Sequence, residues 1–243
     1  MRKNRKFGLI GKNIDYSFSK KYFSEKFKKE NLDCTYSNFD IENISHIESI
    51  LQKKGIYGYN VTIPYKQKII KFLDEIDEVA KSIGAVNTIK KIDNKNIGYN
   101  TDSIAFEKSL LPLIENKKPE NALILGAGGA SKAVKYVLKK LKINYSSVSR
   151  KEGKSELIYE NLNDLILNRF KMIINCSPLG TFPNTNKCPN IPYELLTKDH
   201  VLYDLIYNPI ESLFLKRGKE LGCKTKNGLE MLEIQANESW RIW

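Results

Sequence analysis

The chain has 243 residues, 41% of them hydrophobic, and its 40 Lys and Arg against 28 Asp and Glu give a net charge of +12. This length suits one large or two modest domains with a buried core. The sequence contains no apolar run of 18 residues, and its basic first residues lead straight into a strand-like segment. Both features argue against a membrane span and a signal peptide.

The positive charge is densest near the N-terminus, where residues 1–30 hold ten Lys or Arg and three acids. Within this stretch Phe23 and Phe27 are four residues apart, which predicts an amphipathic helix whose lysines lie in solvent. The chain has 34 lysines but six arginines, with no helix-turn-helix pattern or aromatic platform. We therefore expect the charge to attract small anions rather than nucleic acid.

The cysteines of the chain lie far apart in the sequence: Cys34, Cys176, Cys188 and Cys223. They form no C-x-x-C pair and have no neighbouring histidines. This spacing favours free thiols in a reducing cytoplasm, and it predicts that the protein has no metal site.

Strand and helix patterns alternate along the first hundred residues, as is typical of a parallel sheet with crossover helices. The predicted strands are 7–11, 35–41 and 58–63, and the predicted helices are 19–31, 42–53 and a short pattern at 66–73. An acid-rich helical stretch follows at 74–78, and strands 88–92 and 97–99 then flank a turn at 93–96. The first unit is expected to end at residue 102.

One turn in this unit combines a hydroxyl and an amine. Thr62 and Lys66 lie four residues apart across Pro64, where the strand 58–63 gives way to a helical pattern. Because proline holds the preceding residue extended, the chain turns here at a strand's carboxyl end, the edge at which open α/β sheets bind ligands. On the residues alone, a solvated surface lysine remains the alternative.

A connecting helix is predicted at 103–113, and a second run of alternating elements follows it. The predicted strands are 121–125, 143–149, 172–176 and 201–206, and the predicted helices are 130–140, 160–167, 210–221 and 228–243. In the last helix one face carries Leu229, Leu232, Ala236 and Trp240. Gln235 lies beside that face, and on the residues alone we expect it at the surface.

The strand 121–125 runs into a glycine-rich loop, Gly126-Ala127-Gly128-Gly129-Ala130, at the start of a helix. Glycines let a pyrophosphate approach the backbone and the helix N-terminus supplies N–H donors, so this context predicts a dinucleotide site; a plain strand-to-helix turn is the alternative. About twenty residues on, where NAD enzymes usually carry an acid, the chain reads Ser149-Arg150-Lys151-Glu152-Gly153-Lys154. The planar guanidinium of Arg150 suits a 2′-phosphate, which predicts NADP.

These features belong to an ordered series of motifs that resembles the shikimate dehydrogenase family from Phe7 to Trp243. The series is Gly8-Leu9-Ile10-Gly11 with Ser17-Phe18-Ser19, Asn60-Val61-Thr62-Ile63-Pro64-Tyr65-Lys66, Gly84-Ala85-Val86-Asn87-Thr88, Gly98-Tyr99-Asn100-Thr101-Asp102, the glycine loop, Asn175-Cys176-Ser177-Pro178-Leu179-Gly180, Asp204-Leu205-Ile206-Tyr207-Asn208-Pro209, and Asn227-Gly228-Leu229-Glu230-Met231-Leu232 with Gln235-Ala236.

The resemblance implies a two-domain α/β enzyme that interconverts 3-dehydroshikimate and shikimate with NADPH and NADP, on the route to chorismate and aromatic amino acids. The substrate domain would span residues 1–102, with a mostly parallel sheet, and would be joined by the C-terminal helix at about 228–243. A Rossmann-like NADP-binding domain would span residues 103–227. The expected partners are small molecules and neither nucleic acid nor membrane, with the protein a monomer or homodimer in the cytoplasm.

The resemblance also implies roles for single residues. Ser17 and Ser19 would hold the substrate carboxylate, and the ring hydroxyls would be bound by Thr62, Asn87, Asp102 and Gln235. Lys66 would exchange the proton, with Asp102 orienting it, and Tyr207 would lie near both substrate and nicotinamide. The implied cofactor-binding residues are Gly126, Ala127, Gly128, Gly129, Ala130, Ser149, Arg150, Lys151, Lys154, Leu205 and Gly228. Structural alternatives are a helix cap for Ser19, a turn for Asn87 and packing for Tyr207.

The chain departs from the family pattern at Ser103 and Ala105, where two glycines are usual, at Ser149, where asparagine is usual, and at Trp240, where phenylalanine is common. Three rival functions remain: a quinate/shikimate dehydrogenase that prefers NAD, an NADP-dependent folate dehydrogenase, and a basic binding module without enzymatic activity. The folate enzyme would not explain the paired serines Ser17 and Ser19.

Overall fold

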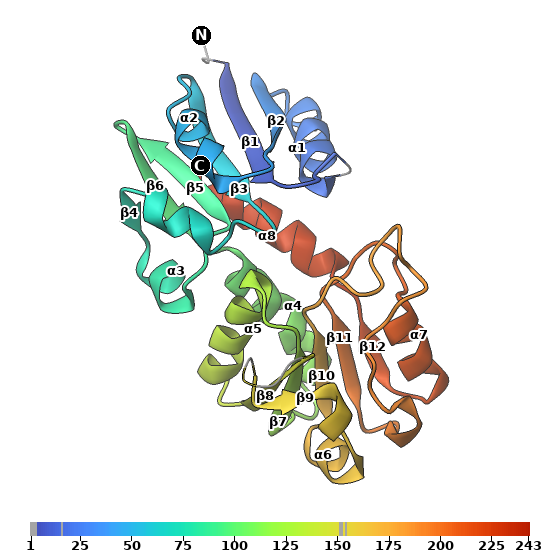
Figure 1. Cartoon of the computed structure of the whole chain (residues 1–243). Coiled ribbons are helices and arrows are strands. Elements are labelled where there is room, and N and C mark those ends of the chain that lie inside the picture. The colour runs from blue at the N-terminus through green and yellow to red at the C-terminus, as the bar shows by residue number, and fades with distance from the viewer. Residues whose placement is uncertain (1–3, 16, 151–152, 154) are drawn as a thin grey trace. The chain divides into compact units, whose positions relative to one another are not determined.

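In the computed structural model, which describes residues 4–15, 17–150, 153 and 155–243, strands and helices alternate as the sequence predicts (Figure 1). The chain divides into two units, residues 1–101 with 236–243 and residues 102–235, and the described residues of each unit contain a six-stranded sheet. The predicted two-domain α/β class with a returning C-terminal helix is confirmed. No helix within the described ranges is long and apolar enough to cross a membrane.

The sheet of the first unit has the strand order β2-β1-β3-β5-β6-β4. Its elements are the strands β1 (Arg5–Gly11), β2 (Cys34–Asp40), β3 (Ile56–Val61), β4 (Glu75–Ile76), β5 (Thr88–Ile92) and β6 (Lys95–Tyr99), the helices α1 (Phe18–Lys29), α2 (Ile47–Leu51) and α3 (Glu78–Ile83), and the 3₁₀ helices η1 (Ile44–His46) and η2 (Lys68–Phe72). β1 pairs in parallel with β2 and β3, whereas β5 is antiparallel to β3 and β6. The carboxyl ends of β1 and β3 therefore meet at one edge of the sheet.

Aromatic packing joins the C-terminal helix α8 (Leu229–Ile242) to the first unit. Phe23 and Phe27, the predicted apolar stripe of α1, are buried. The Phe27 ring lies 5.3 Å from that of Trp240 in α8, and the Phe23 ring lies 5.3 Å from that of Trp243, just beyond the helix. Large aromatic side chains bury much apolar area, so these contacts hold the end of α8 against β1 and α1.

The sheet of the second unit is parallel throughout its described strands, in the order β12-β11-β10-β7-β8-β9. Its elements are the strands β7 (Asn121–Leu125), β8 (Asn144–Ser149), β9 (Leu157–Ile158), β10 (Met172–Asn175), β11 (Val201–Asp204) and β12 (Lys224–Lys226), the helices α4 (Asp102–Ile114), α5 (Gly129–Lys140), α6 (Asp164–Arg169) and α7 (Leu213–Glu220), and the 3₁₀ helices η3 (Tyr159–Asn161) and η4 (Tyr193–Leu195). Numbered within the unit, this order is the 3-2-1-4-5-6 of dinucleotide-binding folds, which reverses between β7 and β10.

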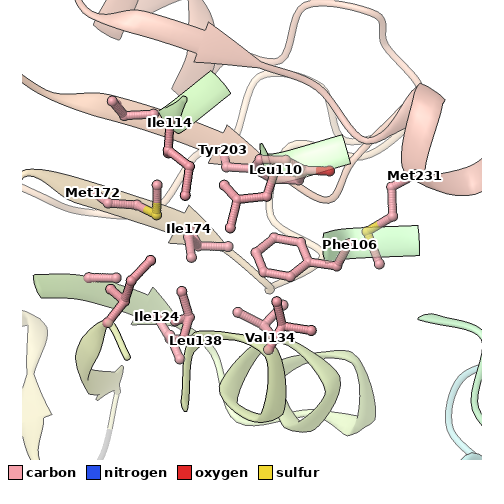
Figure 2. Close-up of a cluster of buried hydrophobic side chains, with 14 of the residues drawn as sticks. Phe106, Leu110, Ile114, Ile124, Val134, Leu138, Met172, Ile174, Tyr203 and Met231 are labelled. Carbon is pink, nitrogen blue, oxygen red and sulfur yellow. The ribbon is translucent and has the colours of Figure 1, made fainter. Parts of the chain in front are cut away.

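Helices cover both faces of this sheet because its strands carry apolar side chains in both directions. Ile124 and Ile174 face α4 and α5, whose side chains Phe106 and Leu138 meet them in one core (Figure 2). The alternate strand positions belong to a second core, formed with α6 and α7: Leu123, Ile173, Leu202, Leu167, Phe214 and Leu215. Continuous apolar runs are typical of such doubly covered parallel strands.

Two predicted helices begin later than expected because an asparagine or aspartate side chain caps each one. The acid-rich stretch from residue 74 forms β4 first, and α3 starts only after Asp77, whose carboxylate accepts from Val79 N. The helix expected at 160–167 is replaced by η3 and α6, and the Asn163 side chain accepts from Ile166 N at 3.1 Å. Such side chains favour the helix N-cap over the helix interior.

Candidate functional site

The predicted turn around Lys66 lies where β3 ends. Thr62 N donates to Ile10 O of β1 at 2.9 Å, and a cis peptide precedes Pro64. Lys66 is half-buried, and its carbonyl accepts from Val86 N at 2.7 Å. The structure therefore brings the Lys66 turn against the loop 84–87, which also contains the predicted substrate residue Asn87.

Asn87 and Thr101 form a reciprocal hydrogen-bonded pair. Thr101 N donates to Asn87 Oδ1 at 2.7 Å, and Asn87 Nδ2 donates to Thr101 Oγ1 at 2.9 Å. Both residues are buried, at 2% and 0% exposed. Because a backbone N–H can only donate, this pairing determines which end of the carboxamide is the oxygen. Asp102, which directly follows Thr101, is buried and opens α4.

Ser17 and Ser19 lie at the N-terminus of α1, after β1 and therefore at the carboxyl edge of that strand. Ser17 occupies the N-cap position, but its side chain makes no capping hydrogen bond to the helix. Ser19 is buried within the first turn, so the alternative that it caps α1 is wrong. A helix N-terminus offers N–H groups and positive potential to an anion, which suits the predicted carboxylate.

The glycine loop of the second unit connects β7 to α5 at the point where the strand order reverses. Gly126 has φ +110°, a conformation that favours glycine, and a Cβ there would lie 3.1 Å from Ser177 N. Gly128 is the N-cap of α5, and a Cβ there would meet nothing within 4 Å. The helix N-terminus is thus open to a ligand at the crevice where dinucleotides bind.

The residues expected near the adenosine lie at the end of β8 and just after it. Ser149 is its last residue, and Arg150 is exposed immediately after it. Burial raises the pKa of Tyr159 to about 12, and the positive charge of Arg150 acts in the opposite direction and lowers it. Lys151 and Lys154, which we also predicted to bind the cofactor, lie outside the described residues.

The buried carboxylate of Asp204 forms hydrogen bonds with residues at the end of β10 and in the segment after β11. Asp204 accepts from Asn175 Nδ2 at 3.0 Å, from Ile206 N at 3.0 Å and from Ser212 Oγ at 2.5 Å. Burial raises the pKa of Asp204 to about 6, although these hydrogen bonds lower it. Asn175 Oδ1 also accepts from Ser177 N, so both motifs are held at the same sheet edge as the glycine loop.

The remaining predicted residues lie in two segments, one directly after β11 and the other at the start of α8 and within it. They are Leu205, Tyr207, Gly228 and Gln235. A Cβ at Gly228 would lie 2.2 Å from the Leu205 carbonyl oxygen, so this glycine packs directly on backbone. Tyr207 is half-buried in the same segment as Leu205. Gln235 is 9% exposed, so the expectation from the residues alone that it lies at the surface is wrong; α8 is buried on the side that carries it.

Sequence reasoning missed a buried polar cluster in the first unit, formed by Asn60, Thr88 and Ser239 with the Asn87 and Thr101 pair. Asn60 Nδ2 donates to Ser239 Oγ at 2.9 Å, and Ser239 Oγ lies 2.7 Å from Thr88 Oγ1. One signal was present, because Ser239 falls on the apolar face of the last helix, three residues after Ala236.

Among the described residues, no group of three or more His, Cys, Asp or Glu side chains is arranged to hold a metal ion. The four cysteines are free thiols. Burial, the largest cause, raises the pKa of Cys176 well above that of an ordinary thiol, and the Asp204 carboxylate raises it further. A raised pKa keeps this thiol protonated at neutral pH, and the protonated form is the weaker nucleophile.

Comparisons with known proteins agree with this geometry. Residues 9–89 match the family model of the shikimate dehydrogenase substrate binding domain. The chain is 41% identical to the shikimate dehydrogenase (NADP(+)) of Methanococcus aeolicus, covering 99% of this chain and 92% of that relative. It is also similar to a crystal structure of a shikimate dehydrogenase in complex with NADP+, with 37% identity and a TM-score of 0.86, covering 99% of this chain and 90% of the other.

Two further structures represent the alternatives for substrate and cofactor. The Thermus thermophilus shikimate 5-dehydrogenase in complex with NADP(H) and shikimate has a TM-score of 0.87 at 25% identity, covering 98% of this chain and 93% of the other. A quinate dehydrogenase from Corynebacterium glutamicum in complex with NAD has a TM-score of 0.85 at 25% identity, with the same coverage. The identity to the Methanococcus relative extends over nearly the whole chain, and on that ground the protein belongs to the shikimate dehydrogenase family.

Proposed function

We propose that this protein catalyses the reversible, NADP-dependent reduction of 3-dehydroshikimate to shikimate in the biosynthesis of chorismate and aromatic amino acids. The observation that carries the proposal is the 41% identity to an NADP-dependent shikimate dehydrogenase over 99% of the chain. It is supported by the positions of the Lys66 turn, which follows β3, and of the glycine loop, which follows β7. The proposal also locates the enzyme in the cytoplasm, acting on small molecules as a monomer or homodimer.

The first unit would supply most of the substrate contacts. Ser17 and Ser19, at the N-terminus of α1, are assigned to the carboxylate, because a helix N-terminus attracts anions. Thr62, Asn87, Asp102 and Gln235 are assigned to ring hydroxyls, and Tyr207 is assigned to a place near both substrate and nicotinamide. This set of side chains suits a ring acid with several oxygens, since each of them carries a hydroxyl, an amide or a charge.

Lys66 is assigned to the proton. In the reducing direction its ammonium would protonate the oxygen that forms at C3, and in the oxidising direction its amine would accept that proton. Asp102 is assigned to a ring hydroxyl and to the orientation of the proton donor. A positioned acid or base of this kind contributes roughly 10²–10⁴ in rate.

The second unit fits a dinucleotide. The open space beside Gly128 and the uncapped N-terminus of α5 form a cradle for a pyrophosphate, which Gly126, Ala127, Gly129 and Ala130 would complete. The bound nicotinamide would supply or accept the hydride. Leu205 and Gly228 are assigned to the nicotinamide side, and the adenosine side is assigned to Ser149, Arg150, Lys151 and Lys154.

The main rival is a quinate/shikimate dehydrogenase that prefers NAD. Arg150 supports NADP instead, because an exposed guanidinium at the end of β8 lies where NAD enzymes usually have an acid. A folate dehydrogenase would leave the paired serines Ser17 and Ser19 unexplained. A basic binding module would bind DNA with salt-sensitive affinity and would not oxidise NADPH.

The deciding experiment measures NADPH oxidation with 3-dehydroshikimate, repeated with NADH, and the reverse reaction with shikimate and with quinate. Rapid turnover of 3-dehydroshikimate with NADPH is expected, and a preference for quinate with NAD would support the rival. In Lys66→Met, kcat should fall by about 10²–10⁴ while shikimate still binds. The matched control is Lys68→Met, an exposed lysine in η2 that should leave kcat unchanged. Nearly intact kcat in Lys66→Met would contradict the assignment.

A further inference from the structure

The buried polar cluster connects the last helix of the chain to a predicted substrate residue. Asn60 comes from β3, Asn87 from the loop before β5, Thr88 from the first position of β5, Thr101 from the residue before α4, and Ser239 from α8. All five are at most 4% exposed and belong to the same unit. Buried polar groups are costly unless they are hydrogen-bonded, so a cluster of this size is highly constrained.

The donors and acceptors of the cluster can be assigned beginning with Asn60. Its Nδ2 lies 3.3 Å from the Asn87 carbonyl oxygen, which can only accept, so this end of the Asn60 carboxamide must be the nitrogen. The other end, Oδ1, accepts from the Tyr36 hydroxyl at 2.8 Å. Asn60 therefore donates to Ser239 Oγ, at 2.9 Å.

Ser239 holds the two threonines of the cluster. Its Oγ lies 2.7 Å from Thr88 Oγ1 and 3.3 Å from Thr101 Oγ1. These hydroxyls in turn contact the Asn87 carboxamide: Thr88 Oγ1 donates to Asn87 Oδ1 at 3.2 Å, and Thr101 Oγ1 accepts from Asn87 Nδ2 at 2.9 Å. The serine hydroxyl thus lies one hydrogen bond away from both threonine hydroxyls that contact this carboxamide.

The carboxamide oxygen of Asn87 is fully engaged within the cluster. It accepts from Thr101 N at 2.7 Å and from Thr88 Oγ1 at 3.2 Å, which uses both of its lone pairs. A substrate that reaches Asn87 therefore meets the N–H end of the carboxamide. The complementary group on the substrate is an oxygen that accepts, such as a ring carbonyl or hydroxyl oxygen.

We propose that Ser239 is a positioning residue that, through Thr88 and Thr101, holds Asn87 so that it meets the substrate as a hydrogen-bond donor to a ring oxygen. The inference rests on the proposed function, which assigns Asn87 to a substrate hydroxyl. It adds the direction of that hydrogen bond and a residue of α8 that no motif of the sequence pointed to. Gln235, another assigned substrate residue, lies one helical turn before Ser239 in α8. The hydrogen bonds of Ser239 therefore also restrain the turn of α8 that carries Gln235.

The test is Ser239→Ala, measured by the KM and Kd for shikimate, the KM for NADP, and thermal stability. Loss of the positioning hydroxyl should raise both shikimate constants about 3–10-fold, in proportion to a lost buried hydrogen bond, with the KM for NADP within about twofold of its original value. The matched control is Ser109→Ala in α4, a buried serine of the other unit that bonds Tyr203. It should lower stability without changing the shikimate constants.

Two more variants separate positioning from general stability. Asn87→Asp keeps the shape but replaces the donor, and it should raise the Kd for shikimate at least about tenfold if Asn87 donates. Ser239→Ala combined with Thr101→Val should raise that Kd by less than the product of the single effects, because both variants act through one carboxamide. If Ser239→Ala does not fold, Thr88→Val is measured in the same way.

The outcomes are distinct. Lower stability in Ser239→Ala with unchanged shikimate constants would overturn the positioning role, as would unchanged affinity in Asn87→Asp. Failure of the proposed function is recognised separately, because the unsubstituted protein would then neither bind nor oxidise shikimate.

Discussion

Gly228 lies directly against the backbone of Leu205: a Cβ at Gly228 would come within 2.2 Å of the Leu205 carbonyl oxygen. Gly228 N also donates to Ile206 O at 2.9 Å, so the two segments are joined by a hydrogen bond beside this contact. Backbone atoms cannot move aside as a flexible side chain can. Only glycine fits here without separating the start of α8 from the segment after β11.

Gly228→Ala is therefore expected to lower the free energy of unfolding by about 1–3 kcal/mol, the usual cost of overpacking a buried position. Because Leu205 and Gly228 are both assigned to the nicotinamide side, the KM for NADPH should rise as well. Urea unfolding and steady-state kinetics at varied NADPH check these two effects. Unchanged stability would show that the two segments can separate at no cost.

Gly128→Ala provides the opposite case in the glycine loop. Its Cβ would meet nothing within 4 Å and its φ is −82°, so the unfolding free energy should change by less than about 1 kcal/mol. A bound pyrophosphate would occupy that space, so the KM for NADPH should rise at least about tenfold while the Kd for shikimate stays the same. Full affinity for NADPH in a folded Gly128→Ala protein would argue against a cofactor at this loop.

Arg150→Gln tests the cofactor preference. A hydrogen-bonded charge pair with a 2′-phosphate is worth about 1.5–3 kcal/mol, so the KM for NADPH should rise roughly 10–100-fold, with the KM for NADH unchanged. Arg169→Gln, an exposed arginine at the end of α6, is the matched control. Equal losses with both cofactors would mean that Arg150 does not contact the 2′-phosphate.

Asp204→Asn tests the buried carboxylate through the pH dependence of stability. The pKa of Asp204 is raised by burial to about 6 in the folded protein from 3.8, so its protonated form favours folding. This contribution is fully present below pH 3.8, and it is lost as the pH rises through about 6; its total size is about 3 kcal/mol. The asparagine side chain cannot ionise, so the fall in unfolding free energy from about pH 4 to about pH 7 should be smaller in this variant.

The measurement is urea unfolding at both pH values, with Asp199→Asn as the control, since Asp199 is an exposed aspartate of the same unit. That control should show the same pH dependence as the unsubstituted protein. An Asp204→Asn protein with the same pH dependence would mean that the carboxylate is not buried in solution.

Much of the architecture could be predicted from short stretches of sequence. The alternation of strands and helices, the Pro64 turn that presents Lys66 and the glycine loop from Gly126 depend on local hydrophobic period and turn chemistry, and the structure confirms those elements. Capping chemistry was equally local, yet the roles of Asp77 and Asn163 as helix caps were missed. The chemical roles of the site residues remain predictions.

The amino-acid sequence by itself determined the α/β class, the order of the elements and the family. Only the tertiary structure decided that Gln235 is buried, that Asp204 lies in an environment that raises its pKa, and that Asn60 of β3 donates to Ser239, which follows it by 179 residues. The physical reason is that helix period, turns and caps depend on neighbours along the chain. The burial and partners of a polar side chain depend on the strand order and on the return of α8, which bring distant residues together.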